Sequence, residues 1–215
     1  MRDALAALAP IAIGYLCGSL PWGLWLGRGV RGVDVRTLGS GNLGATNVYR
    51  SLGPGIGIAT LALDMAKGAL PVWLVPGSPL GVHFPGGPEW CRVAVGSAAI
   101  AGHMWSLFAR FRGGKGVATT AGVLLALSAF AFGVCLAVFL VTVGLTRFIS
   151  VGSMLGAVAC AVMLGLLRGF ASPTALFGAL VAVLVILRHR DNIRRLLRGE
   201  ERRFSLRPAR PGQTP

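Results

Sequence analysis

The stretch VATTAGVLLALSAFAFGVCLAVFLVTVGLT, Val117–Thr146, holds 30 residues without a charged side chain. A helix needs about 20 apolar residues to cross the ~30 Å hydrocarbon layer of a bilayer. The stretch therefore forms either one steeply tilted helix or two short ones. We expect two helices with a turn within Ser128–Gly133, because this arrangement places every basic segment of the chain on one side of the membrane.

The composition of the whole chain excludes a soluble protein. Of its 215 residues, 54% are hydrophobic and only 13% are charged, which leaves too few polar side chains to cover a water-exposed surface. The formal charge of +14 would suit a nucleic-acid partner, but nine of the 21 Lys and Arg residues lie between 188 and 210. Most of the others lie in short polar segments between apolar runs. We therefore expect a lipid bilayer around the protein and no nucleic-acid partner.

The apolar runs predict an all-α, polytopic membrane protein with about seven transmembrane helices. We place these helices near residues 4–27, 53–75, 91–109, 117–129, 131–147, 150–168 and 173–188. We expect residues 1–198 to form a single transmembrane helical domain. Residues 199–215 are expected to form a basic, disordered cytoplasmic tail.

The distribution of positive charge predicts the orientation. Segments 28–52 and 110–116, Arg147 and the chain from Arg188 onward hold nearly all the cations, whereas segment 76–90 holds none. Cytoplasmic segments of membrane proteins are enriched in Lys and Arg. Seven helices with the N-terminus outside and the C-terminus in the cytoplasm satisfy this rule.

The sequence contains no pattern typical of a metal site or a disulfide framework. Cys17, Cys91, Cys135 and Cys160 are far apart and lie within or beside apolar runs, so we interpret them as small buried hydrophobic residues. The seven acidic residues form no cluster that could ligate a cation. We expect the protein to use no metal ion and no cofactor.

A polar, glycine-dense segment lies between the first two apolar runs, with the sequence TLGSGNLGATNVYR (Thr37–Arg50). Its GSGNLG portion matches the spacing of a dinucleotide-binding loop, but a basic segment precedes it where that fold requires a strand. Glycines allow backbone N–H groups to point at an anion, and Ser40, Asn42 and Arg50 add donors suited to phosphate. The alternative is a plain turn between two helices.

A second glycine-rich segment has the sequence FRGGKGVAT (Phe111–Thr119). It is not a Walker loop, because a glycine follows Lys115 where that loop has Ser or Thr. Lys115 nevertheless lies among three glycines at the start of an expected helix, whose N-terminus carries partial positive charge. The alternative, a plain basic anchor, does not require the glycines. Two such loops on one membrane face imply a phosphorylated ligand at the interface.

Four further polar residues lie near the same membrane face. Ser150 and Ser153 are at the start of the sixth expected span, and His189 and Asn192 follow the seventh, three residues apart. The serines could simply cap a helix. The last segment could be a basic helix that binds anionic lipid, although such a helix requires neither His189 nor Asn192.

Two opposite charges, Asp64 and Lys67, lie within the second expected span at positions i and i+3. Intramembrane charges are costly and indicate function by default, although a purely structural pair fits them equally well. For His103, near the end of the third span, we expect a structural role.

Taken together, these segments resemble the bacterial acyl-phosphate:glycerol-3-phosphate acyltransferase family. The shared motifs follow the family order and are GSLPWG (18–23), GSGNLGATN (39–47), DMAKG (64–68), GH (102–103), GGKGVAT (113–119), SVGS (150–153) and HRDNI (189–193). The chain departs from the family in having Arg112 for the usual Lys and in lacking a Thr after Gly199. Neither departure falls on a residue with an expected catalytic role.

The resemblance implies an active site that faces the cytoplasm of the bacterial inner membrane. The implied catalytic residues are Ser40, Arg50, Lys115, Ser153, His189 and Asn192. The residues implied to bind substrate phosphate are Gly39, Gly41, Asn42, Gly44, Asn47, Gly113, Gly114 and Gly116. The supporting residues are Asp64, Lys67 and His103.

The reaction implied by the resemblance is the first step of phospholipid synthesis. A fatty acyl group moves from acyl phosphate to the 1-hydroxyl of glycerol 3-phosphate, giving lysophosphatidic acid and phosphate. The implied partners are these two substrates and the lipid bilayer, with functional coupling to the enzyme that forms acyl phosphate.

Elementary chemistry agrees with such a reaction. An acyl phosphate is an activated mixed anhydride, so direct attack by an alcohol needs positioning and charge stabilisation more than a covalent relay. The proton acceptor is either His189 or a phosphate oxygen of the substrates.

Two rival functions make different demands on the sequence. A transporter for a phosphorylated solute would need polar residues that reach the outer face, whereas the donors here gather on the inner face. A phosphatidyl-transferring enzyme would need a carboxylate-rich metal site, which this chain lacks.

Overall fold

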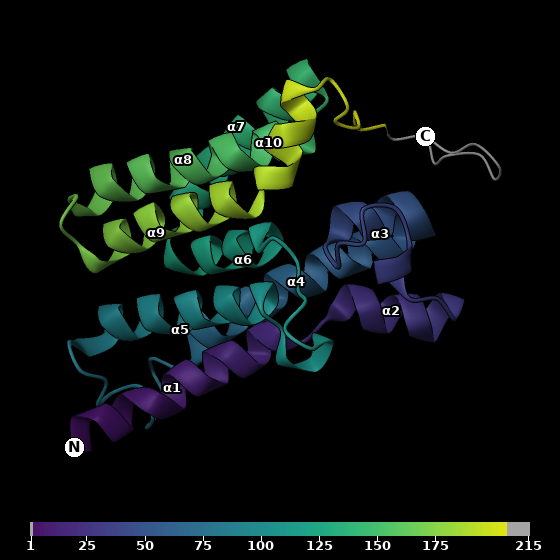
Figure 1. Cartoon of the computed structure of the whole chain (residues 1–215). Helices are drawn as coiled ribbons and strands as arrows, with labels where there is room; N and C mark the ends of the chain where they lie inside the picture. The colour runs from purple at the N-terminus through teal and green to yellow at the C-terminus, as the bar shows by residue number, and fades with distance from the viewer. Residues whose placement is uncertain (1, 206–215) are drawn as a thin grey trace. The chain divides into compact units, whose positions relative to one another are not determined.

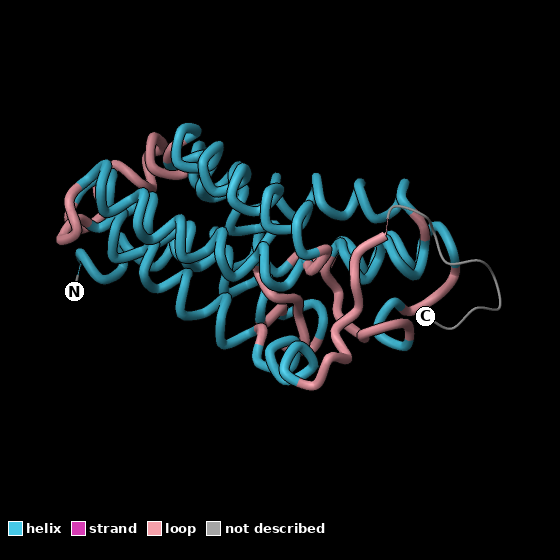
Figure 2. Tube along the Cα trace, turned by 90° about the horizontal axis from the view of Figure 1, so that it is seen from above, coloured by secondary structure: helices cyan, strands magenta, loops and turns pink. Residues whose placement is uncertain are grey.

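The computed structural model describes the backbone of residues 2–205 and the side chains of residues 7–205. Over this range the chain is helical and contains no strand, as Figures 1 and 2 show. The expected all-α class is therefore confirmed. The chain divides into two compact units, residues 1–128 and 129–215.

The first unit contains α1 (Arg2–Ser19), α2 (Trp22–Arg31), α3 (Ala45–Leu52), α4 (Pro54–Leu74), α5 (Gly87–Met104) and α6 (Val117–Leu127), with short 3-10 helices η1 (Val35–Thr37) and η2 (Leu107–Ala109). The second unit contains α7 (Ala129–Thr146), α8 (Ile149–Arg168), α9 (Pro173–Arg188) and α10 (Arg190–Leu197).

The uncharged stretch 117–146 forms two helices, as expected. They are separated at Ser128, whose backbone is extended (φ −161°, ψ 103°). The first expected span, 4–27, corresponds to the apolar segment Ala7–Arg31 but is interrupted, because α1 ends at Ser19 and α2 begins at Trp22. Pro21 accounts for this break, since proline has no N–H to donate and its ring clashes with the preceding helical turn.

The chain is a multi-pass membrane protein. Four segments are long and apolar enough to cross a bilayer, namely Ala7–Arg31, Pro54–Leu74, Ala129–Thr146 and Ile149–Arg168. The pair α9 and α10, bent by 55°, makes a fifth if it is counted as one span. With 11 residues, α6 is too short to cross the ~30 Å layer as a regular helix. The count of seven spans therefore stays a prediction.

Glycines bring α1 and α5 into backbone contact. A Cβ atom added at Gly18 of α1 would overlap the backbone of Ala99 on α5. The reverse holds for Gly102 of α5, which lies against the backbone of Tyr15 on α1. Small residues at such contacts allow close packing of membrane helices, for which the hydrophobic effect supplies no driving force in lipid.

The same device recurs in other helix pairs. In the first unit, Gly68 of α4 lies against Thr119 of α6. In the second unit, a Cβ atom added at Gly178 of α9 would lie 3.0 Å from the Cα of Ala161 on α8. Each unit is therefore built from helix pairs that approach at glycines.

Replacing Gly18 by Ala should lower the free energy of unfolding by about 2 kcal/mol, because the added methyl group forces α1 away from α5. Denaturant unfolding of the purified protein in detergent measures this change. Gly133→Ala on α7 is the matched control, since a Cβ atom there meets nothing within 4 Å. Equal stability of the two variants would contradict the close α1–α5 contact.

Candidate active site

A cavity of about 320 Å³ in the first unit is lined by both glycine-rich segments. The lining residues are Arg36, Ser40, Gly41, Asn42, Arg112 and Gly113. The structure thus brings together two loops that α4 and α5 separate in the chain. Arg36 and Arg112 were not among the expected site residues. Each is a cation within a few residues of a glycine motif, and this proximity was the feature of the sequence that could have identified it.

Asn47 holds the first loop in shape. Its Oδ1 accepts the backbone N–H of Ser40 (2.9 Å), and its Nδ2 donates to the carbonyl oxygens of Asn42 (2.9 Å) and Leu38 (3.1 Å). The side chain is 5% exposed. Both ends of the amide are therefore engaged with the loop backbone. Asn47 was expected to bind phosphate, but in this structure it organises the residues that line the cavity.

The glycines of the first loop allow its backbone to fold compactly. Gly39 and Gly41 have positive φ angles of 56° and 69°, which glycine adopts without strain. The N–H of Gly41 donates to the carbonyl of Leu38 (2.9 Å), and the N–H of Gly44 donates to Oδ1 of Asn42 (2.8 Å). These N–H groups were expected to point at an anion. They are instead committed to the loop, and the cavity is lined in part by Ser40 and Asn42.

The second loop is bonded to the end of α5. The N–H of Gly113 donates to the carbonyl of Met104 (3.2 Å), and the N–H of Gly114 donates to that of His103 (3.1 Å). These bonds satisfy carbonyl groups that the end of a helix leaves without an intrahelical partner.

The two predicted cations of the glycine-rich segments both lie at helix ends. Lys115 directly precedes Gly116, which has a φ of 83° and is the N-cap residue of α6. Arg50 lies in the last turn of α3. Both side chains are half-buried.

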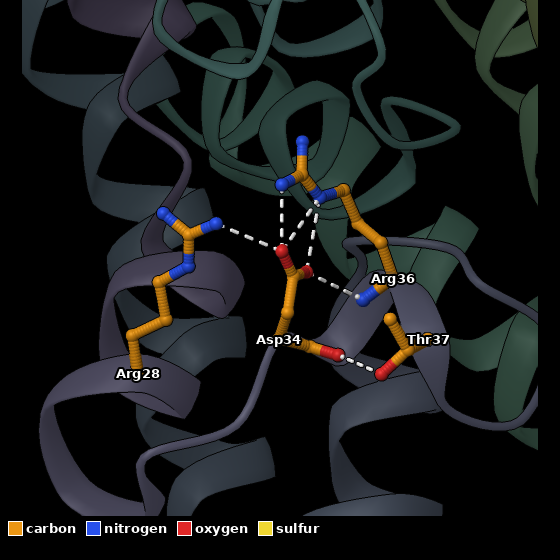
Figure 3. A network of polar contacts seen from close by, with 4 residues as sticks. All are labelled: Arg28, Asp34, Arg36 and Thr37. Atoms are coloured by element: carbon orange, nitrogen blue, oxygen red, sulfur yellow. Dashed lines mark hydrogen bonds and ion pairs between the residues drawn. The ribbon is translucent and has the colours of Figure 1, made fainter.

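An ion-pair cluster fixes the segment that leads into the first loop (Figure 3). Asp34 Oδ2 accepts hydrogen bonds from Nη2 of Arg36 (2.6 Å) and Nη2 of Arg28 (2.8 Å). The guanidinium of Arg36, followed by that of Arg28, holds the pKa of the Asp34 carboxyl well below its ordinary value. Arg36 thus lines the cavity while its position is set by Asp34.

The expected supporting residues form one buried cluster. Nζ of Lys67 lies 2.7 Å from Oδ1 of Asp64 and also donates to the carbonyl of Leu20 (2.7 Å). Nδ1 of His103 lies 3.7 Å from the same Asp64 oxygen. All three ionisable side chains are buried.

Three expected catalytic residues are buried in the second unit. His189 lies at the bend between α9 and α10, with Nδ1 2.7 Å from the carbonyl oxygen of Val185. Asn192 follows it on α10. Ser153 lies on α8 and donates to the carbonyl of Ile149 (2.8 Å). The structure thus brings His189 and Asn192 to one helix junction.

Glu201 is a residue of this region that sequence reasoning missed. Its Oε1 accepts from Nδ2 of Asn192 (2.6 Å) and Oγ of Ser150 (2.8 Å), and its Oε2 accepts from Nε of Arg195 (2.8 Å). Burial raises the pKa of the Glu201 carboxyl, but the hydrogen bonds from Asn192, Arg195 and Ser150 outweigh this effect and leave the pKa below its ordinary value. The sequence feature that could have identified Glu201 was the presence of an acidic residue within an otherwise basic segment.

The segment that carries Glu201 contacts the second unit at further points. The N–H of Phe204 donates to the carbonyl of Arg147 (2.6 Å), and the guanidinium of Arg203 lies 5.8 Å from the ring centroid of Phe148. These residues belong to the part of the expected disordered tail that the structure describes. Residues 206–215 lie outside the described residues.

Glu201→Gln should remove a pH-dependent part of the stability. Because the folded-state pKa of Glu201 lies below the unfolded value, its carboxylate stabilises the folded protein above the ordinary pKa of 4.5. This contribution is lost as the pH falls through the folded-state pKa. Thermal unfolding in detergent should therefore show a gap between wild type and variant that is full at neutral pH and shrinks in acid. The exposed neighbour Glu200, changed to Gln, is the control, and a gap independent of pH would contradict the assignment.

The chain is similar to known proteins over nearly its whole length. The sequence profile of the family described as glycerol-3-phosphate acyltransferase matches residues 8–199. A glycerol-3-phosphate acyltransferase of Anaeromyxobacter sp. (strain Fw109-5) is 45% identical over 208 residues, which cover 95% of this chain and 99% of the relative. One of Geobacter sulfurreducens (strain ATCC 51573 / DSM 12127 / PCA) is 46% identical over 194 residues, which cover 90% and 95%.

Two crystal structures of PlsY (YgiH), an integral membrane glycerol 3-phosphate acyltransferase, have the same fold. The glycerol 3-phosphate form has a TM-score of 0.83 and 36% identity, with 93% of this chain and 96% of that chain covered. The lysophosphatidic acid form has a TM-score of 0.80 and 35% identity at the same coverage. The chain is therefore a membrane acyltransferase that belongs to the glycerol-3-phosphate acyltransferase family.

Proposed function

We propose that this protein transfers a fatty acyl group from acyl phosphate to the 1-hydroxyl of glycerol 3-phosphate, giving lysophosphatidic acid and inorganic phosphate. The observation that carries the proposal is the cavity lined by both glycine-rich loops, where Ser40 and Asn42 lie with Arg36 and Arg112. Guanidinium groups and side-chain donors suit phosphate, and both proposed substrates carry one. The glycerol 3-phosphate and lysophosphatidic acid forms of the similar PlsY structures support this choice of acceptor and product.

The proposed reaction is a direct acyl transfer. The 1-hydroxyl oxygen of glycerol 3-phosphate forms a bond to the acyl carbon, and the bond from that carbon to the phosphate oxygen breaks. The leaving phosphate takes the electron pair, and the alcohol proton goes to His189 or to a phosphate oxygen. Lys115, next to the N-terminus of α6, supplies positive charge that stabilises the leaving phosphate.

The roles of the loop residues follow from their contacts. We propose that Ser40 and Asn42 bind substrate directly, whereas Asn47 positions the loop that carries them. The loops owe their shape to six glycines, Gly39, Gly41, Gly44, Gly113, Gly114 and Gly116. Ser153, His189 and Asn192 keep their predicted catalytic roles, which rest on the resemblance of their motifs to the family.

The membrane placement is part of the same proposal. We place seven spans across the bacterial inner membrane, with the N-terminus outside and the C-terminus and active site on the cytoplasmic side, because the cations of the polar segments gather there. Glycerol 3-phosphate then arrives from the cytoplasm, attracted by the basic rim. The acyl tail enters from the bilayer, and coupling to the enzyme that forms acyl phosphate would supply the donor.

Lys115→Ala and Arg50→Ala should each lower kcat/KM about 100-fold while the protein stays inserted and folded. A buried charge-assisted phosphate contact contributes about 1.5–3 kcal/mol, and more where it strengthens in the transition state. Turnover of purified variants in detergent measures the loss. Arg168→Ala at the C-terminal end of α8 is the control for removal of an exposed cation. If both loop variants kept activity within threefold of wild type, Lys115 and Arg50 would serve only as basic membrane anchors.

The donor is tested by supplying glycerol 3-phosphate with acyl phosphate, acyl-CoA or acyl-carrier protein and measuring lysophosphatidic acid. We expect product from acyl phosphate alone, because the cavity of about 320 Å³ suits a compact phosphate head group rather than a coenzyme or a carrier protein. Equal or faster reaction with acyl-CoA would contradict the proposed donor. Anion flux in liposomes without any acyl transfer would favour the rival transporter.

A further inference from the structure

We propose that Asp64 is a positioning residue that holds both glycine-rich loops in place through two separate chains of contact. Each chain starts at Oδ1 of Asp64, and both lie within the first unit. The inference rests on the proposed function in one respect, because it takes these loops as the elements that bind the substrate phosphates.

The first chain of contacts leads from Asp64 to the second loop. His103 places Nδ1 3.7 Å from the Asp64 oxygen, and the opposite edge of its ring lies against the loop. A Cβ atom at Gly114 would overlap Nε2 of His103, and one at Gly113 would overlap the His103 carbonyl. A shift of the imidazole therefore displaces the backbone of the loop that carries Lys115.

The second chain leads from Asp64 to the first loop. Lys67 bridges Asp64 and the carbonyl of Leu20, with 2.7 Å to each oxygen, and so fixes the break at which α2 starts. A Cβ atom at Gly23, in the first turn of α2, would overlap the carbonyl of Leu43. The start of α2 thus rests directly on the loop that presents Ser40 and Asn42.

A small cavity of about 10 Å³ marks the point where these chains converge. Its walls include the three ionisable residues together with Leu43 of the first loop and Gly114 of the second. A purely structural ion pair would require only Asp64 and Lys67. Buried ion pairs are on balance no more stabilising than apolar side chains of the same volume. Stability alone therefore does not explain why Asp64 and Lys67 are charged at the point where the two chains of contact meet.

Two variants and one control test the proposal. Asp64→Asn removes the charge that orients His103 and Lys67. Because it leaves the Lys67 charge buried without a carboxylate, the double variant Asp64→Asn/Lys67→Met removes both charges and carries the test if the single variant fails to insert. Thr60→Val is the matched control, since Thr60 is buried one turn earlier on α4 and its hydroxyl donates only to the carbonyl of Ile56 among the bonds described for it.

We expect both Asp64 variants to lose about tenfold or more in kcat/KM for glycerol 3-phosphate, because small displacements of positioning groups have large effects on rate. The double variant leaves the Leu20 carbonyl without the Lys67 ammonium, so its thermal midpoint should fall somewhat. Low activity at a temperature well below that midpoint, where the variant is still folded, separates positioning from a structural role. A double variant with wild-type kinetics would overturn the proposal.

Hydrogen exchange gives a readout that does not depend on the reaction. Peptides covering 36–47 and 111–119 should both exchange about tenfold faster in the double variant than in Thr60→Val, because the loop N–H bonds open more often. Unchanged exchange in either peptide would overturn the two-loop role of Asp64. If the wild type turned over no substrate, the proposed function would fail, while the exchange result would still decide the role of Asp64.

Discussion

Hydrocarbon offers no hydrogen-bond partner, so every interruption of a membrane helix must satisfy its backbone groups within the protein. The break between α1 and α2 leaves the carbonyls of Ser19, the last residue of α1, and of Leu20 without an intrahelical partner, and they accept bonds from the side chains of Ser106 and Lys67. The end of α5 is satisfied by N–H groups of the second glycine loop. The positions of breaks and loops in the first unit therefore depend on one another.

This constraint explains why the glycine loops do not simply surround a ligand with backbone N–H donors. Several of their N–H groups donate within the protein, that of Gly41 to the carbonyl of Leu38, that of Gly44 to Oδ1 of Asn42 and that of Gly114 to the carbonyl of His103 at the end of α5. Glycine contributes here by permitting close approach of backbones. The chemistry offered to a ligand then comes from side chains that the compact loops carry, with Ser40 and Arg112 as examples on either side of the cavity.

The sequence predicted those features that depend on local composition. Apolar runs located the helices, and the break at Ser128 was expected. Two loops of similar chemistry were expected on one membrane face, and in the structure residues of both line one cavity. Pro10 and Pro21 show where this reasoning fails, because both lie in the first apolar run, yet Pro10 is inside α1 and Pro21 follows its end. The difference depends on partners distant in the chain, which local composition cannot identify.

The same limit applies to individual polar side chains. Asn47 has the chemistry of a phosphate ligand and of a loop organiser, and only the folded positions of Ser40 and Leu38 distinguish these roles. Glu201 could not be assigned from the sequence for a related reason. Its partners Ser150 and Asn192 belong to different helices, and its own segment has no periodic pattern that would bring it back to them.

The close contact between Gly18 and Ala99 has a consequence for biosynthesis. At about 5–20 residues per second, α5 leaves the ribosome several seconds after α1. During that time the glycine face of α1 stands in the bilayer without its native partner. The close α1–α5 packing therefore forms only after the intervening segment, including α4, has been synthesised, and cannot guide the insertion of α1.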